Sequence, residues 1–171
     1  MRKLIFISIL LIATRAQAQE LNLQSLDKLA SRSSEKTIID LDESTMKLAS
    51  GFLSGNKQDE ATAKKVSSDL KAIHVRTFEF KKDGRYSDAD LQPVYDQLKA
   101  PEWSRIITIK DDEEVGVWLF RKGENATAMA IVVAGSNGLV VVNLVGTIRP
   151  EDLSSVGGQF GIPQIKNLKK D

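Results

Sequence analysis

The chain has 171 residues, a formal net charge of +1 at pH 7 and no cysteine. This length fits one ordinary domain, and the near-neutral charge argues against nucleic acid or an anionic membrane surface as the partner. Without cysteine, the chain forms no disulfide, offers no thiolate to a metal and carries no lipid-modified N-terminal cysteine.

Residues 1–18 have the three parts of a secretory signal peptide. A basic start, Met1–Lys3, precedes the apolar run Leu4–Ala13, which is too short to span a bilayer, and Ala16–Ala18 has the small-x-small pattern of a cleavage site. A buried N-terminal helix is the alternative. Cleavage before Gln19 removes three basic residues and takes the net charge from +1 to −2. We therefore expect one globular domain over residues 19–171, soluble in the periplasm or secreted, with no membrane span.

The first part of this domain is rich in predicted helices. Apolar residues at helical spacing predict a short helix over Leu21–Ser31, a second over Glu43–Leu53 capped by Asp42, and a third over Asp59–Lys71. Thr37–Leu41 has the β-branched composition of a short strand.

A strand and a capped helix follow. Ile73–Phe80 is β-branched and aromatic, which predicts a strand. Ser87 with Asp90 resembles a capping box with Asp in place of Glu, and the helix that it opens ends near Lys99. Pro93 lies inside this pattern, so we expect either a kink or a delayed helix start.

From Trp103 the hydrophobic pattern alternates, which predicts antiparallel strands over Trp103–Lys110 and Val115–Arg121. The hairpin Ala126–Ile148 follows, with Asn137-Gly138 as a type I′ turn and Gly138 at positive φ. This turn would pair Ser136 with Leu139 and Val133 with Val142. We expect an α+β two-layer sandwich, with a mixed, mostly antiparallel sheet of about six strands and helices mainly on one face.

Four short stretches together resemble the bacterial family catalogued as domain of unknown function 4252. They are Val75–Phe80, Leu98–Arg105, Val142–Gly146 and Gln159–Pro163, and their order and spacing cover nearly all of the chain after the signal peptide. The resemblance implies an exported or lipid-anchored envelope protein and brings no assigned activity and no catalytic residues. Members often carry a lipidation cysteine, which this chain lacks.

Candidate catalytic groups are sparse. His74 is the single histidine, and a lone imidazole on a strand is more often a packing or surface residue than a catalyst. Ser136 matches a nucleophile elbow loosely, but a strand rather than a helix follows it. Asp111–Glu114 fits a solvated turn better than a calcium loop, and Gly157–Gly161 lacks the ending of a phosphate loop. We expect no catalytic residue, no metal and no cofactor.

Four residues are candidates for partner or ligand contact: Trp103, Arg105, Asn143 and Phe160. Asn143 interrupts an apolar strand, and a buried amide without partners costs roughly 1–3 kcal/mol. It therefore either bonds a neighbouring loop, such as Gly157–Pro163, or faces a ligand pocket. Trp103 and Arg105 share a strand face and are of types favoured at interfaces, and Phe160 lies in the glycine-rich loop.

The sequence favours an exported, non-catalytic envelope module that binds a protein or a small ligand, with a link to envelope signalling as a further hypothesis. A structural or adhesive envelope domain is the alternative. A hydrolase is less favoured because no coherent acid–base group set is present.

Overall fold

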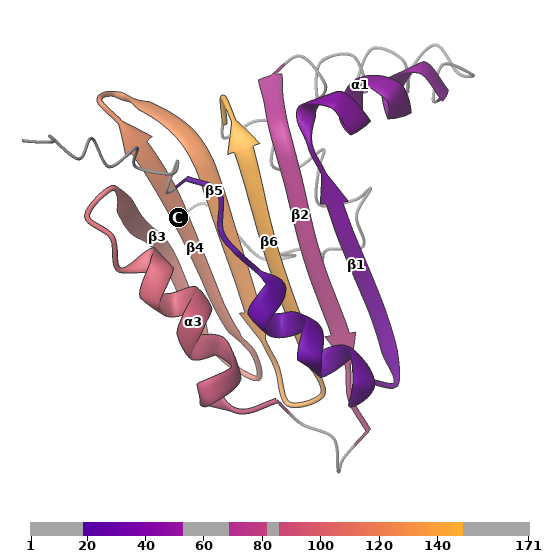
Figure 1. Cartoon of the computed structure of the whole chain (residues 1–171). Helices are drawn as coiled ribbons and strands as arrows, with labels where there is room; N and C mark the ends of the chain where they lie inside the picture. The colour runs from indigo at the N-terminus through magenta and orange to yellow at the C-terminus, as the bar shows by residue number, and fades with distance from the viewer. Residues whose placement is uncertain (1–18, 53–68, 82–85, 149–171) are drawn as a thin grey trace, which may run out of the picture.

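The computed structural model describes residues 19–52, 69–81 and 86–148 of the chain. Six strands form one sheet in the order β1-β2-β6-β5-β4-β3, and every neighbouring pair is antiparallel. The sheet of about six strands is thus confirmed, whereas the expected parallel component is absent among the described strands (Figure 1). The strands are β1 (Glu35–Leu41), β2 (Leu70–Glu79), β3 (Trp103–Lys110), β4 (Glu114–Lys122), β5 (Asn125–Ala134) and β6 (Gly138–Gly146).

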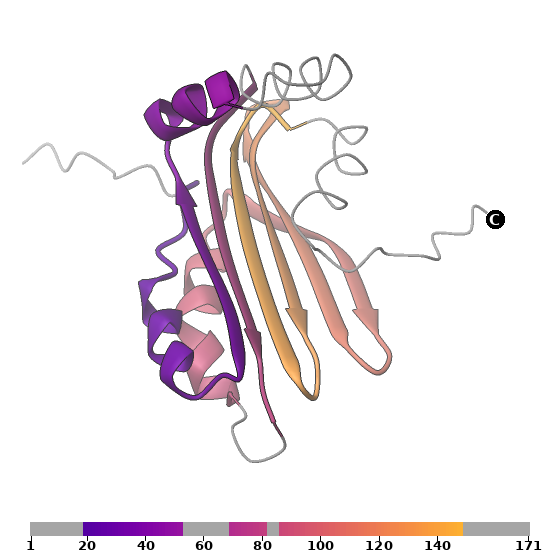
Figure 2. The same cartoon turned by 90° about the vertical axis from the view of Figure 1, so that its right-hand side faces the viewer.

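Three described helical elements accompany the sheet: η1 (Gln24–Ser31, a 3-10 helix), α1 (Glu43–Phe52) and α3 (Asp88–Leu98). η1 and α3 lie side by side over one face of the sheet, and α1 lies at the edge of the sheet where β1 ends and β2 begins (Figures 1 and 2). None of the described helices is long and apolar enough to cross a membrane.

The capping box predicted for α3 is present. The Asp90 carboxylate accepts hydrogen bonds from the backbone N–H and the hydroxyl of Ser87, at 2.8 and 2.9 Å. The helix therefore begins before Pro93, which lies within it and does not delay its start. Asp90 also binds Lys28 and Arg32 of the η1 region, at 2.9 and 3.1 Å, so this one carboxylate joins the two helices.

Apolar side chains gather on both faces of the sheet. On the face that η1 and α3 cover, Leu26, Leu29, Val94 and Leu98 pack with sheet residues such as Trp118. On the other face, Met46 of α1 joins a cluster of sheet residues that includes Val75, Met129, Val142 and Leu144. The strands β5 and β6 contribute to both clusters, which explains why their sequences are apolar at nearly every position.

The central hairpin forms, but its turn differs from the predicted one. Ala134 pairs with Leu139 and Val133 with Val140, and the Gly135 N–H donates to the Gly138 carbonyl, so the turn residues are Ser136 and Asn137. Gly138 does not have positive φ. The predicted pairs are displaced by two residues, which leaves every side chain on its expected face, because side chains alternate with a period of two.

The third predicted helix is also corrected. Leu70 and Lys71, its last two residues, belong to β2 instead; Asp69 is helical, and residues 59–68 lie outside the described residues. β-branched neighbours from Ile73 onward extend the strand backward over Leu70, which is buried. The signal peptide, the loop Gly157–Pro163 and Phe160 also lie outside the described residues.

Candidate functional site

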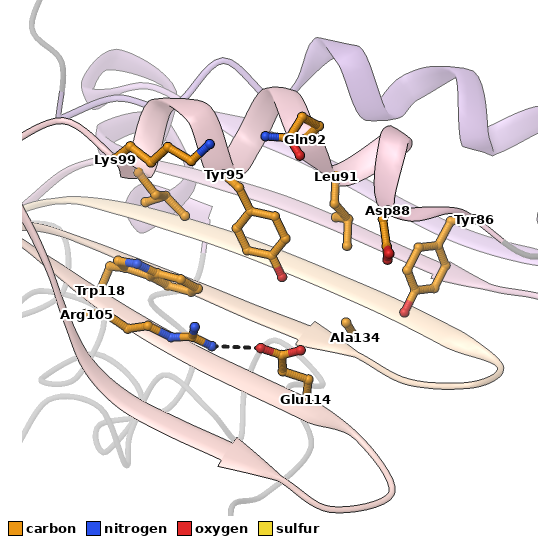
Figure 3. Close-up of a pocket in the computed structure, with 11 residues that line it drawn as sticks. Tyr86, Asp88, Leu91, Gln92, Tyr95, Lys99, Arg105, Glu114, Trp118 and Ala134 are labelled. Carbon is orange, nitrogen blue, oxygen red and sulfur yellow. Dashed lines mark hydrogen bonds and ion pairs between the residues drawn. The ribbon is translucent and has the colours of Figure 1, made fainter.

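A groove lies between α3 and the strands β3 and β4, on the helix-covered side of the sheet, and encloses about 640 Å³ (Figure 3). We call it the α3 groove. Its lining residues come from three parts of the chain, the segment before α3, α3 itself with its C-terminal end, and the sheet: Tyr86, Asp88, Leu91, Gln92, Tyr95, Leu98, Lys99, Arg105, Glu114, Trp118 and Ala134.

Trp118 forms the floor of the α3 groove. Its indole ring occupies the space above Gly116 that a side chain at that position would fill, so the ring lies along its own strand. The Arg105 guanidinium stacks on the ring, with its central carbon 4.7 Å from the ring centroid. Arg105 and Trp118 are direct neighbours in the β3–β4 ladder, which places both side chains on the same face.

The Arg105 guanidinium is held in place, but only some of its N–H donors are engaged. One of its nitrogens, Nη2, donates to Glu114 at 3.0 Å, and its other N–H groups have no partner within the described residues. Glu114 in turn lies 3.8 Å from the Lys110 ammonium. Stacking and ion pairing therefore fix the plane of a guanidinium that still has donors to offer.

Tyr95 reaches from α3 toward the Arg105–Glu114 pair (Figure 3). Its ring centroid lies 6.0 Å from that of Trp118, and its hydroxyl has no hydrogen-bond partner within the described residues. Burial, and then the nearby Glu114 carboxylate, raise the pKa of Tyr95 above its ordinary value. Tyr95 is therefore a neutral phenol at pH 7, and its hydroxyl is free to donate.

The two ends of the groove differ in charge. Asp88, in the first turn of α3, lies at one end beside Tyr86, whose hydroxyl donates to the Gly135 carbonyl at 2.9 Å. Lys99 lies at the other end (Figure 3), and its ammonium forms an ion pair with Asp96 at 2.7 Å. The Asp88 carboxylate has no partner within the described residues.

The residues proposed from sequence are not brought together. Arg105 lines the α3 groove, whereas Trp103 is buried and packs edge-on against Phe120, with ring centroids 5.3 Å apart. Phe160 lies outside the described residues. Trp103 and Arg105 do lie on one face of β3, but only Arg105 reaches the groove.

Asn143 is completely buried and bonds to protein. Its amide oxygen accepts from the Leu21 N–H at 2.9 Å, and its amide nitrogen donates to the carbonyls of Gln19 and Met129, at 3.3 and 3.1 Å. The geometry supports the structural role: the described partners are the segment around Leu21 and the Met129 carbonyl, and the loop Gly157–Pro163 lies outside the described residues.

His74 lies between two carboxylates, with Nδ1 2.8 Å from Asp40 and Nε2 3.1 Å from Glu20. Asp40 also forms an ion pair with Arg76, and the hydrogen bonds from Arg76 hold the pKa of Asp40 below its ordinary value. Arg76 is bound by Asp27 of η1 as well, at 2.6 Å. This network holds η1 and the N-terminal segment against β1 and β2. Among the described residues, no group of three or more His, Cys, Asp or Glu side chains could hold a metal ion.

Sequence reasoning missed Trp118, Tyr95 and Glu114 as groove residues. Trp118 lies within the alternating β4 pattern and Glu114 begins the strand, both opposite β3, so the sequence could have indicated these two residues. Tyr95 could not be found in this way, because the position of α3 over the sheet is set by tertiary packing.

No curated protein and no solved structure is significantly similar to this chain. A family model described as a domain of unknown function, DUF4252, matches residues 31–156, which include every described residue of the α3 groove. The chain therefore belongs to the DUF4252 family.

Proposed function

We propose that this DUF4252 protein is an exported, non-catalytic binding module of the cell envelope and that its ligand occupies the α3 groove. In this proposal the protein is a two-layer α+β sandwich with helices mainly on one face. The α3 groove is the space between α3 and the strands β3 and β4. The observation that carries the proposal is the Arg105 guanidinium, stacked on Trp118 and anchored by Glu114, with donors still unpaired.

The free groups in the groove define the ligand that it suits. The Arg105 donors and the Tyr95 hydroxyl favour an acceptor such as a carboxylate, because a fixed guanidinium binds planar acceptors through two hydrogen bonds. At the other end, the Asp88 carboxylate favours a cation or another donor. The rings of Tyr86 and Tyr95 suit an apolar part between the two. A zwitterionic small molecule or a short peptide segment of a partner protein meets these requirements.

Binding is favoured over catalysis by the state of the two carboxylates in the groove. Glu114 is committed to Arg105 and Lys110, which leaves it poorly placed to accept a proton from a substrate. Asp88 is exposed in the first helical turn, and no histidine lines the described groove.

The test is a titration of the ¹⁵N-labelled exported protein with tripeptides Ala-Phe-Ala that have either free or blocked termini. We expect the free peptide to shift the Trp118 indole N–H signal and to bind at least about tenfold more tightly than the blocked one, a difference of about 1.4 kcal/mol. Trp103→Phe assigns the signal, because the chain has two tryptophans.

Two variants decide the outcome. Arg105→Ala removes the stacked guanidinium and should abolish the shift, while Arg121→Ala removes an exposed arginine outside the groove and should leave it unchanged. If neither peptide shifts the Trp118 signal, or if Arg105→Ala binds as the unaltered protein does, the groove is not the binding site. A structural or adhesive role would then be the better hypothesis.

A further inference from the structure

The two edges of the sheet carry the two exposed large hydrophobic residues of the described chain. Ile38 on β1 is 43% exposed and Ile106 on β3 is 45% exposed. β1 and β3 are the first and last strands in the sheet order, so each has one side on which no described strand pairs. Such an edge presents unpaired backbone N–H and C=O groups and can accept a further strand.

Only one of these edges is regular. The β3–β4 ladder changes register between Arg105 and Ile107, and this irregularity falls at the exposed Ile106. Bulges of this kind protect an edge from pairing. β1 pairs with β2 without interruption from Glu35 to Leu41, and it contains neither glycine nor proline. Figure 2 looks onto β1, the described strand nearest the viewer.

The β1 sequence Glu-Lys-Thr-Ile-Ile-Asp-Leu is complementary to itself in an antiparallel arrangement. With a two-fold axis at Ile38, Ile38 faces Ile38 of the second copy, Thr37 faces Ile39, and Lys36 faces Asp40. Directly opposed residues share a face, so this arrangement also continues each face of the sheet into the second copy.

Neighbouring registers lose this complementarity. An axis at Thr37 would place Lys36 opposite Ile38, and an axis at Ile39 would place Ile38 opposite Asp40. Each buries a charge against isoleucine. The geometry points to a homodimer in which β1 pairs antiparallel with β1 of a second copy about an axis at Ile38.

The charged pair is partly prepared in the single chain. Asp40 is already held by Arg76 at 2.9 Å and by His74 at 2.8 Å, and its side chain remains 51% exposed. Lys36 makes one long hydrogen bond, 3.4 Å, to the Ala30 carbonyl. Lys36 therefore has little to lose on turning to Asp40 of the second copy, and the symmetry makes this contact twice.

The first test compares matched substitutions on the two edges. Ile38→Lys places two ammonium groups opposite each other and should raise the dimer dissociation constant at least tenfold, as measured by sedimentation equilibrium of the exported protein. Ile106→Lys makes the same change on the bulged edge and should leave the constant unchanged. Far-ultraviolet circular dichroism checks that both variants are folded.

The second test fixes the register and uses the absence of cysteine from the chain. Under mild oxidation, Ile38→Cys should form a covalent dimer, because the two residues face each other across the axis. Lys36→Cys and Ile106→Cys should stay monomeric on reducing-agent-free gels. A protein that is monomeric at millimolar concentration, a dimer that persists in Ile38→Lys, or cross-linking through position 106 or 36 in preference to 38 would each overturn the proposal.

Discussion

Arg76 and Arg105 lie on the same face of one sheet, yet they have opposite surroundings. The Arg76 side chain, beneath η1, is 3% exposed and bonds to Asp27, to Asp40 and to two backbone carbonyls. The Arg105 side chain, beside α3, is 35% exposed, has one carboxylate partner and rests on Trp118. The first arginine is fully engaged by its own chain and the second keeps donors for another molecule. A guanidinium therefore indicates a binding site when some of its N–H donors have no partner in its own chain.

The largest effect is expected at Arg76. Burial alone would lower its pKa, but Asp40 and Asp27 outweigh burial and raise it, so the cation is firmly held. Arg76→Met leaves both carboxylates without their cation. Removing one partner of a buried pair costs roughly 3–5 kcal/mol, and because both carboxylates reach water here we expect a loss of about 2–4 kcal/mol in urea unfolding. A loss below about 1 kcal/mol would show that the network is not structural.

The next effect is expected at Asn143, which ties the N-terminal segment to the sheet on the same side as Arg76. Asn143→Ala removes the hydrogen bonds of the side-chain amide to the Leu21 N–H and to two carbonyls, which should lower the free energy of unfolding by about 1–3 kcal/mol. Hydrogen exchange of the Leu21 amide should accelerate along with it. Unchanged exchange at Leu21 would mean that Asn143 does not hold this segment.

A third prediction concerns acid, at the point where η1 meets α3. Burial alone would raise the pKa of Asp90, but hydrogen bonds from Lys28 and Ser87 and the charge of Arg32 hold it well below its ordinary value. A carboxyl group whose pKa is lowered in the folded state stabilises the protein above its unfolded pKa, about 3.9, and this contribution is lost as the pH falls below that value.

Unfolding in urea at about pH 5 and about pH 2.5 measures this contribution. The unaltered protein should lose more stability between these two pH values than Asp90→Asn does. Equal losses in the two proteins would show that Asp90 does not contribute to acid sensitivity.

The smallest stability effect is expected at Arg105. Its ion pair with Glu114 is partly exposed, and such pairs, like exposed cation–π contacts, contribute at most about 1 kcal/mol. Arg105→Met should therefore unfold within about 1 kcal/mol of the unaltered protein while it loses the proposed ligand. A loss as large as that of Arg76→Met would remove the distinction between the two arginines.

The sequence predicts the strands better than it predicts the site. Alternating and β-branched runs locate all six strands, since these patterns follow directly from which faces are buried. The sequence misplaces the turn at Ser136 because Asn-Gly is the stronger local turn signal. In the structure the Phe80 N–H, directly after β2, donates to the Asn137 carbonyl and so connects this turn to the end of β2. Local preference gave way there to a contact between distant segments.

The α3 groove could be predicted only in part. Arg105 stood out because of its type and its place on a strand face. Its relation to Tyr95 depends on where α3 lies over the sheet, and neither spacing nor propensity determines that position. Asn143 illustrates the converse: its burial was readable from the apolar residues around it, but its partners at Gln19 and Leu21 are far away in the chain.

The bond between Leu21 and Asn143 also bears on the order in which the molecule assembles. It joins residues 122 positions apart, and β2 can complete its own pairing only when β6 is available. Contacts between such distant segments form slowly, because a long loop must close before they can stabilise anything. A chain that emerges from its N-terminus cannot place its first described segment until its last described strand has been made. For a protein that is exported as we propose, this delay would keep the chain unfolded while it passes through a translocation channel.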